Sequence, residues 1–480
     1  MRFVRRNGSS NGAAHPARLE EYLAPAVDTS LALKDGAGVA SGAAGASKGA
    51  HNGSLLQKPE LIDAKVRLHR KLIDELNLSL IDKISRVELR DQVHDLVSDH
   101  VLSERIPLNA SELEAFVDEV MDELTGLGPI EPFLKDPTVS DILINTHEHV
   151  YVERFGQLEV VPVRFKDEAH VLRIANKIVS AVGRRVDESQ PMVDARLLDG
   201  SRVNVAIRPV AVDGPLVSIR KFINQIFDLD SLITMGTLKA PMARLLSEAV
   251  RARVSIVVSG GTGSGKTTFL NALSRSISFR ERLITIEDAA ELQLQQPHVG
   301  RLETRPPNIE GDGEIRQREL VKNALRMRPD RIIVGEVRGE EAFDMLQAMS
   351  TGHEGSMTTI HANSPRDAVL RLEQMVGMAG YRMTEGTIRS HIASAIRVIV
   401  QLQRFADGKR RVTSISEITG MEGQIVQMQE LYRFDVTGPS RDGNVKGEFR
   451  ASGLRPSFLE ALLLNGAEFG EDAFHPGAPL

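Results

Sequence analysis

The chain has 480 residues, of which 41% are hydrophobic, and a formal net charge of −6 at pH 7. This length predicts about three domains, and the weak negative charge argues against general nucleic-acid binding. Because there is no cysteine, structural disulfides and thiolate zinc sites are excluded. We find neither a secretory signal pattern nor a run of about 18 apolar residues, and therefore expect a cytoplasmic protein that meets membranes only peripherally.

Three regions and a linker are predicted over residues 1–237. Residues 1–58 lack sustained periodicity and include a Gly/Ala/Ser run, which predicts a disordered arm. Residues 59–135 carry apolar residues at helical spacing and predict a small helical domain. The period then changes to two, so residues 136–225 predict strands around one helix in an α/β domain, followed by a linker over 226–237.

Alternation along two predicted strands of this α/β domain places arginines on one face. In the strand 201–208, β-branched residues at alternate positions predict a buried face, so Arg202 and Arg208 share the opposite face. Arg220, in the strand 216–220, has the same orientation. A solvated polar face is the simplest interpretation, but beside a triphosphate such arginines become candidate γ-phosphate ligands.

A phosphate-binding loop is predicted after the strand that begins at Val254. The pattern G-x-x-x-x-G-K-[ST] stands between that strand and a segment with helical spacing. Backbone N–H groups of such a loop surround phosphate oxygens, Lys266 supplies a positive charge, and the Thr267 hydroxyl is placed to bind Mg²⁺. A glycine-rich turn without a ligand is the alternative. We expect a nucleotide site made of Gly260, Gly261, Thr262, Gly263, Ser264, Gly265, Lys266, Thr267 and Thr268.

The nucleotide-binding core is predicted over residues 238–435, where strands alternate with helices. This alternation predicts a doubly wound sheet with its ligand at the carboxyl ends of the strands. The polar segment from Pro297 to Gly311 predicts a long loop within the core. Residues 436–480 are predicted to form a C-terminal extension, to which the chemistry of the residues assigns no function.

Three candidate catalytic side chains each follow a predicted core strand, namely Glu287, Glu336 and His361. A carboxylate beside the γ-phosphate can orient or deprotonate the attacking water, and Glu336 is the first candidate for that role. Glu287 would polarise water or hold the hydration shell of the metal, and the two roles could be exchanged. His361 would contact the γ-phosphate and report its loss, or would be a structural histidine at a strand end.

Four motifs in the core resemble the Walker A, Asp, Walker B and His boxes of the secretion-superfamily ATPases of type II secretion, type IV secretion and type IV pili. They occur in that order at residues 260–268, 285–288 with Glu291, 326–338 and 352–361. The segments 301–308 and 416–423 are similar to the branch typified by CpaF, the tight-adherence (Tad) pilus ATPase.

This resemblance implies a homohexameric ATP hydrolase in which a PAS-like middle domain and a RecA-like core close around ATP and Mg²⁺. The ring would work on a polytopic inner-membrane platform, driving pilin subunits into or out of a pilus. Arg202 and Arg220 match the arginines that reach the γ-phosphate from the middle domain, whereas Arg208 stands where relatives often have proline. The type II branch usually carries a four-cysteine zinc insert, from which this chain departs.

Other functions remain open at this point. A type IV secretion traffic ATPase, which exports protein or DNA, would use the same site, although such proteins are generally shorter and lack the extra helical domain. Lys266, Glu336 and the arginines argue against a regulatory module that binds ATP without hydrolysing it. A helicase shares the RecA-like core, but no aromatic stacking platform or basic tract supports binding of nucleic acid.

Overall fold

The computed structural model describes residues 85–222, 227–307, 312–439 and 445–476. The predicted arm, residues 1–58, and the start of the predicted helical domain, residues 59–84, lie outside the described residues.

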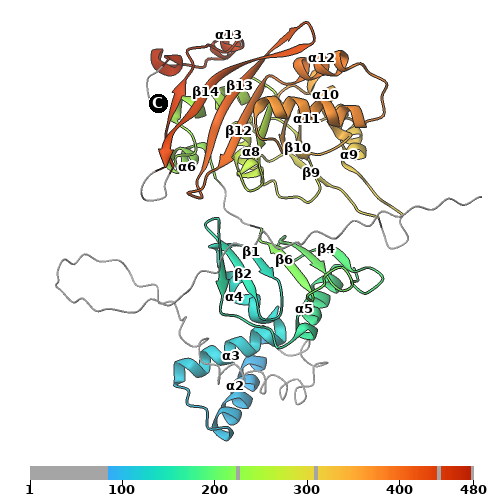
Figure 1. Ribbon diagram of the computed structural model, residues 1–480, viewed down its shortest axis with the longest axis vertical. Helices are drawn as coiled ribbons and strands as arrows, with labels where there is room; N and C mark the ends of the chain where they lie inside the picture. Colours follow the sequence, from blue (N-terminus) through green and yellow to red (C-terminus); the bar gives the residue numbers. More distant parts are fainter. Residues whose placement is uncertain (1–84, 223–226, 308–311, 440–444, 477–480) are drawn as a thin grey trace, which may run out of the picture. The chain divides into compact units, whose positions relative to one another are not determined.

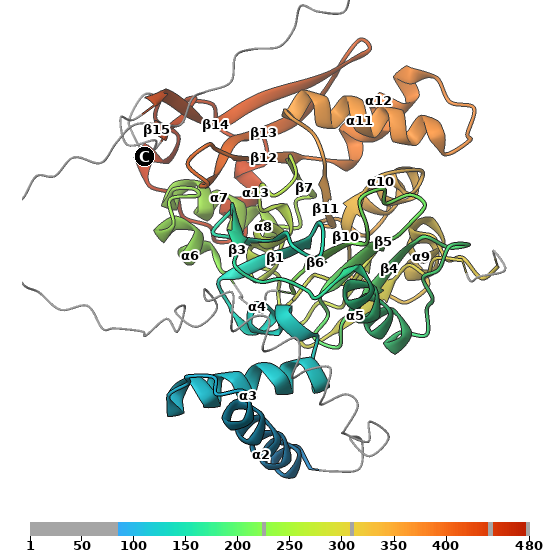
Figure 2. The same cartoon turned by 60° about the horizontal axis from the view of Figure 1, so that its bottom comes forward.

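Two helices form the first described part of the chain. Helices α2 (Arg86–Ser103) and α3 (Ala110–Thr125) pack against each other (Figures 1 and 2). Each begins with a capping box, at Ser85 and at Asn109, whose side chain accepts a hydrogen bond from the third backbone N–H of the helix. Their shared core consists of Leu89, Val93, Val97, Val101, Phe116, Val117, Val120 and Met121.

A six-stranded antiparallel sheet with one helix against it follows. The strand order is β3-β2-β1-β6-β5-β4, and every neighbouring pair is antiparallel. Helix α5 packs on the face that carries the buried valines and isoleucines, so the polar side chains of alternate positions lie on the other face. The elements are η3 (Gly128–Ile130), α4 (Glu131–Lys135), β1 (Val139–Ile144), β2 (Val150–Arg154), β3 (Gln157–Val161), α5 (Glu168–Ala181), β4 (Met192–Arg196), β5 (Arg202–Ala206) and β6 (Leu216–Arg220).

The rest of the described chain is built on a nine-stranded sheet with the order β15-β14-β13-β12-β7-β11-β10-β8-β9. Six neighbouring strands of this order are parallel to one another, namely β12, β7, β11, β10, β8 and β9. Strands β13, β14 and β15 extend the sheet beyond β12, each antiparallel to its neighbour. The strands are β7 (Ile256–Gly260), β8 (Leu283–Glu287), β9 (Val299–Glu303), β10 (Arg331–Val337), β11 (Met357–Ile360), β12 (Val398–Arg404), β13 (Arg410–Glu422), β14 (Ile425–Pro439) and β15 (Val445–Ala451).

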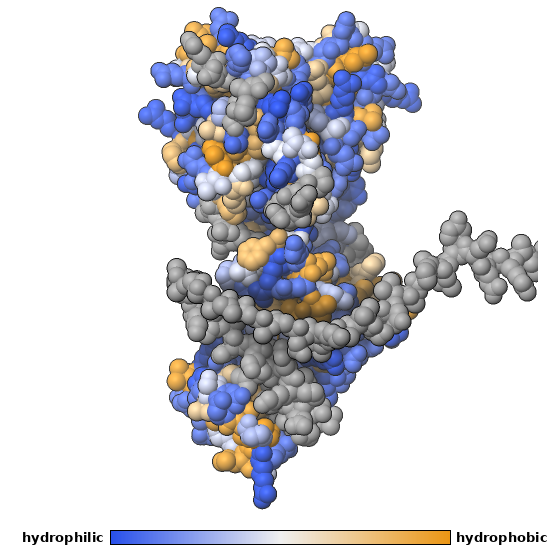
Figure 3. All heavy atoms as spheres, turned by 60° about the vertical axis from the view of Figure 1, so that its left-hand side comes forward, coloured by the Kyte–Doolittle hydropathy of each residue, from blue (hydrophilic) through white to orange (hydrophobic). Residues whose placement is uncertain are grey.

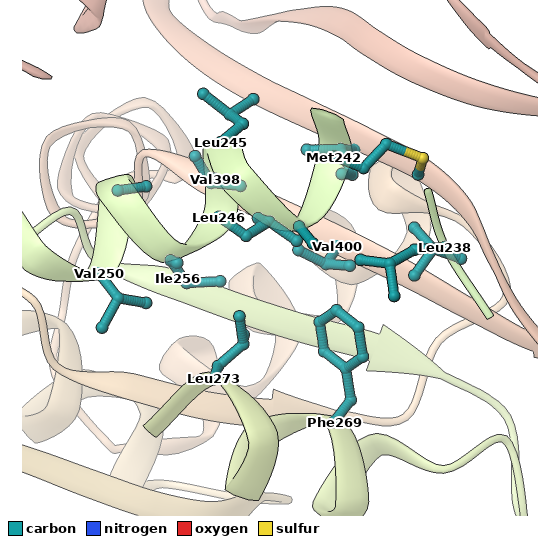
Figure 4. Close-up of a cluster of buried hydrophobic side chains, with 14 of the residues drawn as sticks. Leu238, Met242, Leu245, Leu246, Val250, Ile256, Phe269, Leu273, Val398 and Val400 are labelled. Carbon is teal, nitrogen blue, oxygen red and sulfur yellow. The ribbon is translucent and has the colours of Figure 1, made fainter. Parts of the chain in front are cut away.

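Helices cover both faces of this sheet, as expected for a doubly wound fold. On one face, α7 and α8 pack with β7 and β12 around Leu246, Phe269 and Val400, all of which are buried (Figure 4). A second buried cluster on the other face joins α9, α10, α11 and α12 to the sheet. The helices are α6 (Leu229–Thr234), α7 (Ala240–Arg251), α8 (Lys266–Ser274), α9 (Gln317–Ala324), α10 (Glu341–Ser350), α11 (Pro365–Met378), α12 (Glu385–Ala395), α13 (Leu459–Leu464) and η4 (Glu471–Phe474). The fold class is therefore the predicted one, an α/β protein with a RecA-like core.

Two segments expected to be irregular contain regular structure. The predicted long loop contains β9, an edge strand whose backbone pairs with β8 although its side chains are partly exposed. The predicted linker, residues 226–237, contains α6, which is capped by Asp228 and buries Leu232. In both cases backbone pairing and capping outweigh a weak hydrophobic pattern.

The predicted boundary between the core and a C-terminal extension at residue 436 is wrong. It falls inside β14, and β15 adds a further strand to the same sheet. Side chains from the predicted extension, including Phe449, Leu462 and Phe474, belong to the core cluster around α7 and α8. Long-range strand pairing, which is not visible in local sequence, places this segment in the core.

The surface of the described residues is mixed in character. Figure 3 shows one face on which hydrophilic side chains predominate and apolar ones are scattered among them. Among the helices of the described ranges, none is both long enough and apolar enough to cross a bilayer.

Candidate functional site

The phosphate loop connects β7, whose residues are all buried, to α8. Gly263 and Gly265 have φ angles of +67° and +90°, a region that favours glycine. A Cβ atom on Gly260 would lie 2.5 Å from the Ser264 hydroxyl oxygen and 2.6 Å from the Leu402 carbonyl oxygen. Because these positions carry no side chain, the loop backbone can curl tightly around a phosphate group. The loop leads directly into the first turn of α8, where unpaired backbone N–H groups favour anions.

Lys266 is the first residue of α8 and is largely enclosed by the loop. Its ammonium group donates hydrogen bonds to the carbonyl oxygens of Gly260 (3.0 Å) and Gly261 (3.1 Å), and it lies 3.8 Å from Glu336 Oε1. Burial lowers the pKa of Lys266, and the negative charge of Glu336 opposes this effect. A bound phosphate would offer this partly desolvated cation a stronger partner than the two carbonyls.

Glu336 lies near the end of β10 and contacts cations through both carboxylate oxygens. Its Oε2 accepts hydrogen bonds from Nε (2.8 Å) and Nη2 of Arg338, while Oε1 is the oxygen nearest to Lys266. Arg338 also donates through Nη1 to Asp288 (3.1 Å). Arg338 thus connects the Walker B-like segment to the Asp-box-like segment, a link that was not predicted.

Glu287 ends β8 and is only 4% exposed. Its Oε2 accepts hydrogen bonds from the backbone N–H groups of Glu291 (2.7 Å) and Leu292 (2.9 Å), whereas Oε1 has no hydrogen-bond partner among the described residues. Burial raises the pKa of Glu287 despite these two hydrogen bonds. A Cβ atom on Gly335 would lie 2.8 Å from Glu287 Cγ, so the glycine beside Glu336 makes room for this side chain.

His361 directly follows β11, the strand between β7 and β10. Ile360 pairs with Ser259 on one side and with Val337 on the other, which places His361 at the same sheet edge as the phosphate loop and Glu336. The structure therefore brings the carboxyl ends of β7, β8, β10 and β11 together, as the sequence predicts. The individual catalytic roles of Glu287, Glu336 and His361 stay predictions.

Arg202 and Arg220 are direct partners across β5 and β6. Arg202 donates through Nη2 to the Ala289 carbonyl oxygen (2.9 Å), and its Nε lies 3.0 Å from Glu291 Oε1, so it contacts the segment that follows Glu287. Arg220 is 61% exposed and donates to Asp141 (3.2 Å). The two arginines thus share a face, and each pairs with a nearby acid.

Arg208 does not share that face, contrary to the prediction from alternation. Strand β5 ends at Ala206, and the chain then turns, with the N–H of Val210 bonded to the carbonyl oxygen of Ile207. The Arg208 guanidinium lies 3.6 Å from Glu168 at the start of α5, the helix on the buried face of the sheet. Alternation fails here because it holds only while the backbone remains extended.

The β12–β13 hairpin brings two further arginines to the phosphate loop, which the sequence interpretation missed. Arg410 donates through Nε to the carbonyl oxygen of Gly263 (2.9 Å). A Cβ atom on Gly263 would lie 3.3 Å from Nη1 of Arg404. The Asp407-Gly408 turn is a hairpin signal, but the pairing of β12 with β7 that carries the hairpin to the loop is a long-range contact.

Comparisons with known proteins identify the family of this chain. The family model described as "Type II/IV secretion system protein" matches residues 123–438. A Mycobacterium tuberculosis protein named for conjugal transfer is 38% identical over 324 residues, which is 66% of this chain and 92% of that protein. The conjugal transfer protein TrbB of Rhizobium radiobacter is 32% identical over 305 residues, 63% of this chain and 90% of that protein. The crystal structure of the Brucella suis VirB11 ATPase with sulphate is 29% identical, covers 60% of this chain and 94% of its own, and has a TM-score of 0.33.

Proposed function

The chain belongs to the family of type II/IV secretion system proteins, and on that premise we propose that it is an ATPase that converts ATP hydrolysis into domain motion. The observation that carries this proposal is the meeting of Lys266 and Glu336, 3.8 Å apart, at the mouth of a glycine-rich loop. A phosphate-binding cation and a candidate general base at one sheet edge are what hydrolysis of a β–γ anhydride requires.

The loop N–H groups and Lys266 would bind the phosphates and neutralise their charge. Mg²⁺ would be held by the Thr267 hydroxyl and, through water, by Glu287, whose buried Oε1 lacks a hydrogen-bond partner among the described residues. When bound, this ion would neutralise charge on the outer phosphates. Its preference for oxygen ligands and retained waters fits this donor set.

Glu336 would orient and deprotonate the attacking water, a role that requires at least one free carboxylate oxygen. Because Lys266 and Arg338 contact its two oxygens, we infer that a bound nucleotide draws Lys266 away and frees Oε1. Arg202 and Arg220 would leave their acidic partners to reach the γ-phosphate, and His361 would sense the loss of that phosphate.

We further propose that the protein acts as a cytoplasmic homohexamer of the Tad type, powering pilus assembly at a polytopic inner-membrane platform. The similarity of segments 301–308 and 416–423 to the CpaF branch supports this assignment. Export of protein or DNA by a type IV secretion channel is the second candidate, because the relatives above are named for conjugal transfer. Identification of the membrane protein that co-purifies with the full chain separates the two: a pilus platform supports the first, and a conjugation channel component supports the second.

Steady-state hydrolysis by the purified protein tests the ATPase proposal. We expect Lys266→Ala and Glu336→Ala to lose turnover by about 10³-fold or more, because one removes phosphate binding and the other the base. Glu336→Ala should still bind ATP, whereas Lys266→Ala should not. Glu448→Gln, which alters an exposed carboxylate on β15, serves as the matched control. Hydrolysis by Glu336→Ala at the wild-type rate would remove Glu336 as the base.

A further inference from the structure

We propose that Arg410, which lies opposite Arg404, binds the phosphate groups of the nucleotide directly and completes the phosphate site from the hairpin beside the loop. This inference rests on the proposed ATPase function and adds residues to it. Neither arginine lies in the four motifs that resemble the superfamily boxes.

Strand pairing fixes the position of both residues. Strand β12 runs parallel to β7, and Leu402 pairs with Gly260, the first glycine of the phosphate loop. Arg404 comes two residues later, so it extends past the point where the loop leaves the sheet. Arg410 pairs directly with Arg404 across the β12–β13 hairpin. The backbone alone therefore places two arginines beside the loop.

The side chains of both arginines lie against the backbone of the phosphate loop. Arg410 donates through Nε to the Gly263 carbonyl oxygen (2.9 Å), and a Cβ atom on Gly265 would lie 3.0 Å from Arg410 Cδ. Nη1 of Arg404 lies close to Gly263 as well.

The charges at this position call for an anion. Like charges directly opposite each other on neighbouring strands destabilise a sheet, yet Arg404 and Arg410 are such a pair. Arg404 donates through Nη2 to the Gly156 carbonyl oxygen, and its Nη1 lies 3.7 Å from Glu153. The Nη groups of Arg410, by contrast, have no hydrogen-bond acceptor within the part of the chain that the structure describes. Arg410 as a whole is exposed, but the surrounding protein partly desolvates its guanidinium group. This desolvation is the main cause that lowers the pKa of Arg410, and the positive charge of Arg404 lowers it further. A polyphosphate would satisfy the free donors and offset the repulsion.

The neighbouring residue shows what a structural arginine looks like in the same hairpin. Arg411 is buried, forms a 2.8 Å ion pair with Asp407, donates to the Val445 carbonyl oxygen and lies over the ring of Phe405. Its donors and its ring contact are accounted for by the fold. Arg410 faces the other way, and its Nη donors are accessible to a ligand.

Titration calorimetry with ATP and ADP on the full chain, combined with kcat and KM, tests the proposal. We expect Arg410→Gln to weaken the affinity for both nucleotides by about 10- to 100-fold and to raise KM similarly, because it loses charge-assisted hydrogen bonds to phosphate. Turnover at saturating ATP should fall much less. Lys409→Gln removes a charge one residue away, on an exposed side chain, and should bind ATP as the wild type does.

Arg410→Lys separates ligand binding from a purely structural role. It keeps a positive charge but lacks the Nε–H that bonds Gly263, so we expect it to recover most of the lost affinity. Wild-type affinity in Arg410→Gln would overturn the proposal, and so would an Arg410→Lys variant as weak as Arg410→Gln. If the wild type itself bound no nucleotide, the ATPase proposal would fall and this inference with it.

Discussion

Two regions differ in how firmly their side chains are held. One is the core edge, where the carboxyl ends of β7, β8, β10 and β11 meet, and the other is the arginine face of the six-stranded sheet, which carries Arg202 and Arg220. At the core edge, Glu287 is buried and Lys266 is bonded to loop carbonyls, so both have fixed positions before any ligand arrives. On the arginine face, Arg220 is mostly exposed, and Arg202 is paired with Glu291, which follows Glu287 in the core. One region is preorganised, whereas the other can exchange partners.

This difference indicates which region suits binding of the phosphates and which suits detection of the γ-phosphate. A site whose groups are already close to their places needs little reorganisation to bind phosphate, since Lys266 would only exchange its carbonyl partners for phosphate oxygens, and electrostatic catalysis requires such preorganisation. Exposed ion pairs contribute only about 0–1 kcal/mol each, so a triphosphate can take Arg202 and Arg220 from their acids at little cost. We therefore expect substitutions of the exposed arginines to lower turnover with little effect on stability, and substitutions of buried ion-paired groups in the core to lower stability.

The largest expected effect is on turnover. Arg202→Gln and Arg220→Gln should each lower kcat by about 10³-fold, as for arginines that stabilise a transferring phosphoryl group, while the free energy of unfolding changes by less than about 1 kcal/mol. Steady-state hydrolysis and urea unfolding measure the two quantities. Arg208→Gln is the matched control, because Arg208 lies toward Glu168 and away from this face. An equal loss in the control would show that the arginine face has no special role.

The next effect is on stability, in the core. Arg331, with no exposed surface, donates two hydrogen bonds to Glu281 (2.7 and 2.9 Å) and one to the Gly355 carbonyl oxygen. Arg331→Met leaves Glu281 buried without this partner and should cost about 3–5 kcal/mol in urea unfolding. A loss below about 1 kcal/mol would mean that the core is as adaptable as the arginine face.

The smallest effect concerns Glu287 and its dependence on pH. Since burial raises the pKa of Glu287 in the folded chain, its contribution to stability is fully present below the unfolded pKa and is lost as the pH rises through the folded pKa. Glu287→Gln should therefore raise Tm at pH 8 by on the order of 2 °C, with a smaller gain at pH 5, while hydrolysis falls. Thermal unfolding at the two pH values measures this, and a Tm lower at pH 8 than that of the wild type contradicts it.

The sequence was sufficient to predict the parts of the site that local patterns encode. The loop glycines, Lys266 and the residues at strand ends could be predicted because a parallel sheet collects the carboxyl ends of its strands at one edge. Alternation also predicted that Arg202 and Arg220 share one face of the sheet, where the structure shows them as direct partners. It failed for Arg208, where a turn ends the extended backbone.

Long-range pairing accounts for what could not be predicted. Arg410 reaches the phosphate loop only because β12 lies beside β7, and local sequence does not reveal which strands are neighbours. The same holds for β15 and the helix α13, whose residues enter the core although their composition indicated an extension. Arg338 is close to Asp288 for the same reason, since β8 and β10 are neighbours in space.

A structure of the Glu336→Gln variant with bound ATP tests directly whether the predicted side chains surround the nucleotide. We expect the triphosphate in the loop of residues 260–268, its γ-phosphate facing Gln at position 336, and Arg202 and Arg220 released from Glu291 and Asp141 to contact that phosphate. Nucleotide bound elsewhere, or both arginines still paired with their acids while ATP fills the loop, would contradict the account.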